Sequence, residues 1–262
     1  MATNDVTSWV RALRASHDQL TGIVAGLDGD GLRAQSYDTE WSIAQVLSHL
    51  GSGAEIFALA IDAGVAGDEP PSTEAFKPIW DAWNARSPEE QAARSVTANE
   101  ALVARIEALT PQERTDFHVT MFGRMPMDLA GVLGMRLSEH AVHTWDIAVV
   151  LDPQAKVAPD AVDLIIDRLG MMAGFSGKKA PAPVTVAVTT TAPDRAFTLD
   201  TGTQETGGVT LSPAAADDAP TASVSLPSES FLRLVYGRLD DAADVTSSGV
   251  TLAELKSVFP GF

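Results

Sequence analysis

The chain has 262 residues, of which 45% are hydrophobic, enough to bury one large hydrophobic core or two smaller ones. Its 35 acidic residues outnumber 18 basic ones, and the resulting net charge of −17 disfavours binding to nucleic acid or to an anionic membrane surface. The absence of cysteine excludes disulfides, thiolate ligands to a metal and a cysteine nucleophile.

The sequence also bears on cellular location. No apolar run approaches the length of about 18 residues that marks a membrane-spanning helix. The first residues show no basic region followed by an apolar run, which is the pattern of a signal peptide. We therefore expect no membrane span, and a cytoplasmic location.

Four long helices are predicted in the first part of the chain. Ser42 and Gln45 have the spacing of a capping box at the start of the second helix. The third helix starts with a Ser87 cap followed by Pro88. The apolar periodicity places the four helices at residues 5–27, 42–63, 87–109 and 126–151. Four helices of this length predict a four-helix bundle over residues 1–153.

After Pro153 the pattern changes to mixed helix and strand. A helix is predicted at residues 159–174, and β-branched, alternating segments then predict strands. The predicted strands span residues 184–190, 196–200, 208–211 and 222–226, and two helices follow at 228–236 and 251–258. The expected fold class is therefore α plus α+β, with a smaller α+β domain at residues 154–262.

A line of polar residues runs along the fourth predicted helix. Arg136, Glu139, His143 and Asp146 are spaced by three, four and three residues, which places them on one helical face within an otherwise apolar element. Burying a carboxylate beside an imidazole costs free energy unless something compensates, and a divalent cation is one such compensation. His49 on the second helix is the natural third ligand. The alternative is a Glu139–His143 helix pair and a partly buried His49.

Three further residues have two interpretations each. Asp146 could accept a hydrogen bond from a metal-bound imidazole, or it could be a solvated acid. Arg136 could bind a substrate carboxylate or pair with Glu139. Arg238, just after the glycine that ends a predicted helix, could present its guanidinium to a carboxylate or be a solvent-exposed cation.

The remaining histidines are not assigned to this site. His140 is rotated by about 100° from Glu139 on the helix, so it is expected to pack against a neighbour. His17 lies on an apolar stripe and is expected to be a core histidine. His118 lies in a loop-like segment and receives no role.

These motifs resemble a known family. Residues 40–50 (EWSIAQVLSHL) resemble the signature W-(S/T)-x-x-(D/Q)-V-x-x-H-L of the mycothiol-dependent maleylpyruvate isomerases, and residues 139–146 (EHAVHTWD) resemble that family's E-x-x-x-H-x-x-D. The segment 225–252, with Gly237-Arg238 at its centre, is similar to the family's carboxy-terminal domain, which is related to sterol carrier proteins. The resemblance implies a DinB-like helical domain followed by that second domain.

The resemblance also implies a chemistry. His49, Glu139 and His143 would hold zinc, or another divalent first-row metal, with water as the fourth ligand. Mycothiol, the low-molecular-weight thiol of actinobacteria, would replace the water and bind as a thiolate. The family's carboxy-terminal arginine corresponds best to Arg238. The expected function is then addition of the thiolate to a small electrophilic, carboxylate-bearing substrate, in an isomerisation or a mycothiol S-transfer.

Two alternatives come from other classes of protein. A non-catalytic binding protein would carry an apolar ligand in its second domain and use the metal for structure. Because structural zinc sites usually have four protein ligands, the three candidate ligands favour a catalytic metal over a structural one. A metal-dependent hydrolase of the DinB-like superfamily would instead use zinc-bound hydroxide and need no thiol.

Overall fold

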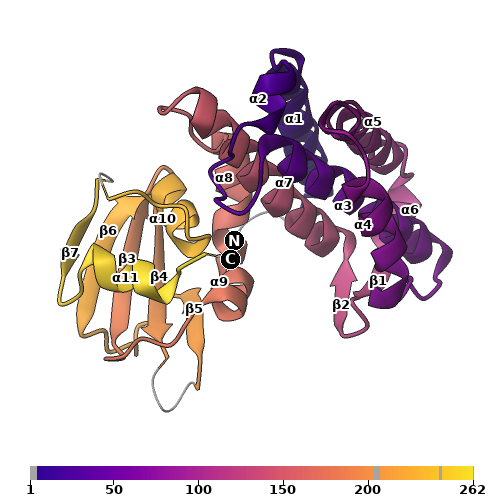
Figure 1. Cartoon of the computed structure of the whole chain (residues 1–262). Helices are drawn as coiled ribbons and strands as arrows, with labels where there is room; N and C mark the ends of the chain where they lie inside the picture. Colours follow the sequence, from indigo (N-terminus) through magenta and orange to yellow (C-terminus); the bar gives the residue numbers. More distant parts are fainter. Residues whose placement is uncertain (1–4, 203–206, 242–243, 262) are drawn as a thin grey trace. The chain divides into compact units, whose positions relative to one another are not determined.

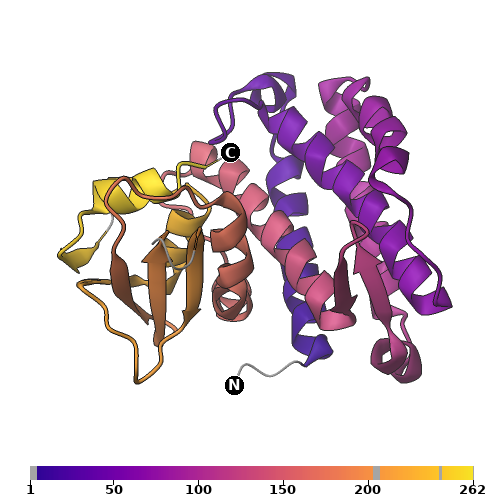
Figure 2. The same cartoon turned by 90° about the horizontal axis from the view of Figure 1, so that it is seen from below.

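The computed structural model describes residues 5–202, 207–241 and 244–261. The chain divides into two compact units, Met1–Ala161 and Val162–Phe262, which are drawn in Figures 1 and 2. The predicted domain limit between residues 153 and 154 stays a prediction. Residues 1–4, on which the signal-peptide expectation partly rests, lie outside the described residues, as do residues 203–206 between two predicted strands.

The first unit is built around four long helices. They are α1 (Val6–Ala25), α3 (Ile43–Ala66), α5 (Pro88–Glu107) and α7 (Leu129–Leu151). Helix α3 packs along α5 and α1 packs along α7, as Figures 1 and 2 show from two directions. Buried side chains that cluster in this core include Leu20, Ile43, Val46, Leu47, Leu50, Ala92 and Ile147. Shorter elements complete the unit: α2 (Gly29–Arg33), η1 (Thr73–Phe76), α4 (Lys77–Asn84) and α6 (Pro111–Asp116).

The starts of α3 and α5 are fixed by capping boxes, which confirms the sequence interpretation. The amide of Gln45 donates to Ser42 Oγ at 3.3 Å, and the amide of Ser42 donates to Gln45 Oε1 at 2.8 Å. Ser87 and Glu90 make the same reciprocal pair at the start of α5. Each pair satisfies amides that would otherwise lack an acceptor in the first helical turn. The first box sets the residue at which α3 begins, about two turns before His49.

The predicted start of the fourth helix at residue 126 is wrong. Residues Met125–Asp128 form strand β2, which pairs antiparallel with β1 (His118–Met121), so His118 lies in a strand and not in a loop. Gly123, with φ of 68°, supplies the left-handed conformation in the connecting turn. Asp128 Oδ1 then accepts from the amide of Gly131 at 2.7 Å and caps α7. Because Asp128 is the cap, α7 begins at Leu129.

Helix α3 is long and apolar enough to cross a membrane by length and composition alone. Its 18-residue window has a mean hydropathy of 1.2, but 67% of that window is buried inside the structure. Such burial is typical of the core helix of a bundle.

The second unit contains a five-stranded sheet. Its strands are β3 (Thr185–Thr191), β4 (Arg195–Thr201), β5 (Val209–Pro213), β6 (Ala222–Pro227) and β7 (Thr246–Ser248), in the order β5-β4-β3-β6-β7. Strands β3 and β6 are parallel, and the other neighbours are antiparallel. Strand β7 was not predicted, and the predicted helix at 159–174 is divided into α8 (Pro159–Ile165), η2 (Ile166–Arg168) and α9 (Leu169–Ser176).

Alternating residues of the central strands bury one face of the sheet. Val186, Val188 and Leu199 are fully buried. Helices α10 (Ser228–Val235) and α11 (Leu252–Val258) supply further buried residues, and the ring of Phe231 on α10 lies 5.7 Å from that of Phe197 on β4. The helical bundle followed by this sheet-containing unit confirms the predicted fold class.

Close packing of α3 gives a stability prediction. A Cβ added to Gly51 would lie 2.2 Å from the ring of Trp83, which is 1% exposed and cannot easily shift. We expect Gly51→Ala to lower the free energy of unfolding by about 1–3 kcal/mol, as overpacking usually does. Gly22→Ala is the matched control, because the added methyl on α1 meets nothing within 4 Å and should raise stability by about 0.5–1 kcal/mol. Urea unfolding measures both, and equal effects of the two substitutions would contradict the packing argument.

Candidate metal centre

Three side chains from α3 and α7 converge at one point of the first unit. His49 Nε2 lies 3.1 Å from Glu139 Oε2, and His143 Nε2 lies 3.8 Å from the same oxygen. One ligand atom from each of the three residues lies within 4.8 Å of the other two. The structure therefore brings together the three side chains that the sequence singled out, although His49 is ninety positions from Glu139 in the chain.

Asp146 fixes the orientation of the His143 ring. Its Oδ2 lies 2.8 Å from His143 Nδ1, and the carboxylate is fully buried. A carboxylate acceptor at this position places the proton on Nδ1, which leaves the Nε2 lone pair directed at Glu139 and His49. Asp146 is thus a buried hydrogen-bond partner of the imidazole and not the solvated acid of the alternative interpretation.

Trp41 covers the two imidazoles. Its ring centroid lies 5.1 Å from that of His49 and 6.1 Å from that of His143, and the two imidazole rings lie 4.8 Å apart. Trp41 stands in the family signature, but no pattern in the sequence predicted this contact with the two imidazoles. The signal that could have indicated it was its position directly before the Ser42 cap, which brings it beside the first turns of α3.

His49 and Glu139 influence each other's protonation. Burial is the largest effect at His49 and lowers its pKa, although the hydrogen bond to Glu139 opposes this. Burial alone would raise the pKa of Glu139. The hydrogen bond from His49 and the positive charges nearby outweigh burial and lower that pKa to about 2. At neutral pH the site therefore holds a carboxylate and a neutral His49, the protonation states that metal coordination requires.

The arrangement fits a divalent first-row metal. Ligand atoms held about 2.1 Å from a tetrahedral zinc ion lie about 3.4 Å apart, close to the two ligand-atom distances measured to Glu139 Oε2. Two imidazole nitrogens and one carboxylate oxygen suit zinc and its neighbours in the first transition row. The side chains of His49 and Glu139 are 35% and 31% exposed, so an incoming ligand can reach the site from solvent.

Arg136 does not take the position that a substrate-binding role would require. Arg136 is only 2% exposed. Its Nη2 donates to the carbonyl of Leu50 at 2.9 Å and to Asn99 Oδ1. In this position the guanidinium cannot touch a substrate unless the helices separate. It also forms no ion pair with Glu139, so neither interpretation of Arg136 from the sequence fits. Nothing in the sequence pointed to Asn99 on α5 as its partner.

Arg238 belongs to the second unit. It is 7% exposed, not a solvent-exposed cation, and its Nη1 donates to the carbonyl of Tyr236 at 2.7 Å. Its assignment to a substrate carboxylate stays a prediction.

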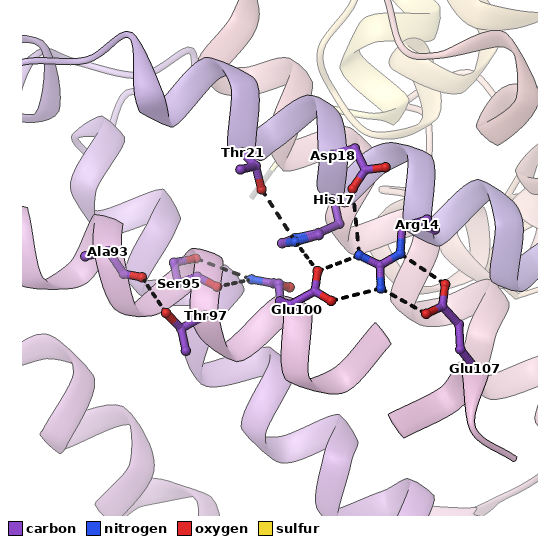
Figure 3. Close-up of polar contacts among 10 residues, drawn as sticks. Arg14, His17, Asp18, Thr21, Ala93, Ser95, Thr97, Glu100 and Glu107 are labelled. Atoms are coloured by element: carbon purple, nitrogen blue, oxygen red, sulfur yellow. Dashed lines mark hydrogen bonds and ion pairs between the residues drawn. The ribbon is translucent and has the colours of Figure 1, made fainter. Parts of the chain in front are cut away.

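Two other histidines belong to a polar cluster formed by side chains of α1, α5 and α7. His140 is fully buried and its Nδ1 lies 2.8 Å from Ser16 Oγ. His17 Nε2 lies 3.0 Å from Glu100 Oε2, and Arg14 joins Glu100 to Glu107, as Figure 3 shows. A cavity of about 600 Å³ opens beside this cluster, lined by His17, Asp18, Thr21, Gly22, Val96, Thr97 and Glu100.

Comparison with known proteins gives three findings. The family described as mycothiol maleylpyruvate isomerase N-terminal domain matches residues 13–148, just over half of the chain. A crystal structure of a mycothiol-dependent maleylpyruvate isomerase superimposes with a TM-score of 0.69 at 15% identity, covering 97% of this chain and 98% of the other. A structure of a mutant of a mycothiol-dependent maleylpyruvate isomerase gives the same TM-score at 14% identity. At these identities the superpositions show a shared fold.

One curated relative is similar over a shorter stretch. It is a putative metal-dependent hydrolase from Geobacillus thermodenitrificans, 35% identical over 75 residues. The match covers 29% of this chain and 40% of the relative's length.

The cluster around His17 predicts a pH dependence of stability. Burial lowers the pKa of His17 below its ordinary value of 6.5, against the opposing charge of Glu100. Just below pH 6.5 the unfolded chain then binds more protons than the native protein, so stability falls as the pH drops through this interval. We expect His17→Gln to reduce that fall, measured as urea unfolding free energies between about pH 5 and 7.

The control for this experiment is His118→Gln, which removes an exposed imidazole from β1. Its pH profile should follow that of the unmodified protein. A His17→Gln profile as steep as that of the unmodified protein would contradict the assignment.

Proposed function

The chain belongs to the family of the mycothiol maleylpyruvate isomerase N-terminal domain, and from this we propose that it is a metal-dependent enzyme that uses mycothiol. In this proposal His49, Glu139 and His143 bind one divalent metal ion, zinc being the metal that best suits the ligand set. The observation that carries the proposal is the convergence of these three ligand atoms within 4.8 Å of one another.

The open geometry favours catalysis over a structural metal. Structural zinc sites are usually closed by four protein ligands, whereas catalytic sites keep one position for water or substrate. Three protein ligands converge here among the described residues, and two of their side chains are about one third exposed. A non-catalytic binding protein with a structural metal is therefore the weaker candidate.

When bound, the metal would hold the thiol of mycothiol as a thiolate at neutral pH, and this thiolate could add to a cis double bond and later leave after rotation about the resulting single bond. In mycothiol S-transfer the adduct would instead be released. The chain has no cysteine of its own, so the sulfur must come from outside.

The residues of the chain have separate tasks in this proposal. His49 and His143 offer ring nitrogens, and Asp146 holds the His143 ring in the tautomer that leaves Nε2 free to coordinate. Trp41 packs beside both rings. Arg238 remains the candidate for a substrate carboxylate, as its guanidinium suits a planar anion.

A metal-dependent hydrolase is the second candidate. The relative from Geobacillus thermodenitrificans carries that description, and this supports the candidate over the matched stretch alone. The same three ligands would then serve a metal-bound hydroxide, and no thiol would be required.

Metal content tests the ligand assignment. We expect purified protein to contain about one metal ion per chain, and His143→Ala to lose it, because removing one of three ligands leaves two. The matched control is His118→Ala, which removes an exposed histidine from β1 and should retain the metal. Elemental analysis and circular dichroism on all three proteins measure metal and fold together. An unmodified protein that stays empty after addition of zinc would exclude the metal centre.

Thiol dependence separates the two enzymatic candidates. We expect the zinc-loaded protein to convert maleylpyruvate, or a model electrophile, only when mycothiol is present, because no residue of the chain can supply a thiolate. Isomerisation is followed by absorbance, and an S-adduct by mass spectrometry. Hydrolysis of ester or amide substrates at the same rate without any thiol would favour the hydrolase instead.

A further inference from the structure

Arg136 is a buried cation without an acidic partner. Its Nη2 donates to two neutral acceptors, the carbonyl of Leu50 and the side chain of Asn99. Its Nε has no hydrogen-bond partner, and no carboxylate among the described residues forms an ion pair with it. Burial lowers the pKa of Arg136 only to about 10, so the group is charged at neutral pH.

The groups that pack against this guanidinium, Gly53 and Phe57, are also uncharged. A Cβ on Gly53 would lie 2.9 Å from Nη1, so glycine at this position of α3 leaves room for the charge. The Cζ atom lies 5.6 Å from the ring centroid of Phe57. An unpaired buried charge is costly, so its retention calls for a compensating interaction farther away. The acid on which it acts is Glu139, three residues on, whose pKa it helps to lower.

The buried charges around the three ligands can be counted. Glu139 contributes one negative charge and Arg136 one positive charge, and Asp146 contributes a second negative charge as the carboxylate that accepts from His143 Nδ1. A divalent metal would bring the sum to one positive charge, so one anionic ligand would make the centre neutral. Without Arg136 the same centre would already be neutral, and an anion would bring an excess negative charge into a partly buried site.

We propose that Arg136 determines the ligand specificity of the centre, because its buried charge makes the open coordination position favour an anion, such as a thiolate, over a neutral ligand. This inference rests on the proposed metal centre. Arg136 acts through the electrostatic field of its charge and does not touch the metal or its fourth ligand. It is therefore a positioning residue and not a catalytic one.

A purely structural role makes a different prediction. Through Leu50 and Asn99, Arg136 joins α7 to α3 and α5, and losing these bonds could displace His49. A displaced ligand would weaken every fourth ligand alike. Only an electrostatic role separates anionic from neutral ligands.

The test uses protein loaded with Co²⁺, whose visible spectrum changes when a fourth ligand binds. Azide is the anionic probe, and imidazole at mildly alkaline pH is the neutral probe. Arg136→Met removes the charge while keeping an apolar chain of similar length. Asn99→Asp keeps Arg136 and neutralises it, because the new carboxylate takes the place of an amide oxygen that already accepts from Nη2.

Asn99→Leu is the control without charge: like Asn99→Asp it loses the hydrogen bonds donated by the amide nitrogen, and it also loses the acceptor for Arg136 Nη2, but it adds no carboxylate. We expect Arg136→Met and Asn99→Asp each to weaken azide binding about tenfold, the effect of a modest charge–charge interaction. Imidazole binding should change by less than about twofold in both, and Asn99→Leu should keep the ratio of the unmodified protein. If Arg136→Met does not fold, the Asn99 pair carries the test alone.

Three outcomes would overturn the inference. Equal losses of azide and imidazole binding would assign Arg136 a structural role. An unchanged azide affinity in Asn99→Asp and Arg136→Met would remove any role in ligand choice. An unmodified protein that binds no Co²⁺ would instead overturn the proposed metal centre, and the inference with it.

Discussion

The contact between His49 and Glu139 is the interaction on which the first unit's candidate function depends. It joins α3 to α7 at a place where a carboxylate and two imidazoles are partly withdrawn from water. Such a cluster costs free energy unless each polar group finds a partner, and here each does. His49 contacts Glu139, and His143 contacts Asp146. The helices around it are therefore packed to hold a polar centre within an apolar bundle.

Two buried residues next to the ligands, Asp146 and Arg136, explain how this centre tolerates partial burial. Asp146 accepts from His143 and Arg136 lies one turn before Glu139 on the same helix, so each buried group acts on one of the three ligands. Neither group reaches solvent. Because a low dielectric strengthens electrostatic interactions, a change at Asp146 or Arg136 should act strongly on the three ligands.

Much of the local structure could be predicted because its causes lie within a few residues. Each capping box is a set of hydrogen bonds between positions three apart, and the apolar stripes of α1, α3 and α5 follow one helical period. The β1–β2 hairpin could not be found this way. Pro126 and the apolar residues after it also satisfy a helical pattern, and strand pairing with His118–Met121 decided against it.

The sequence by itself determined the residue types and spacing of the candidate centre: Glu139 and His143 share a helical face because four residues make about one turn. Only the tertiary structure decided that His49 meets them and that Asp146 accepts from His143. It also decided that the buried guanidinium of Arg136 donates to Leu50 and Asn99. The reason is physical: helical periodicity is a local property, whereas the partner of a side chain on another helix depends on how whole apolar faces pack.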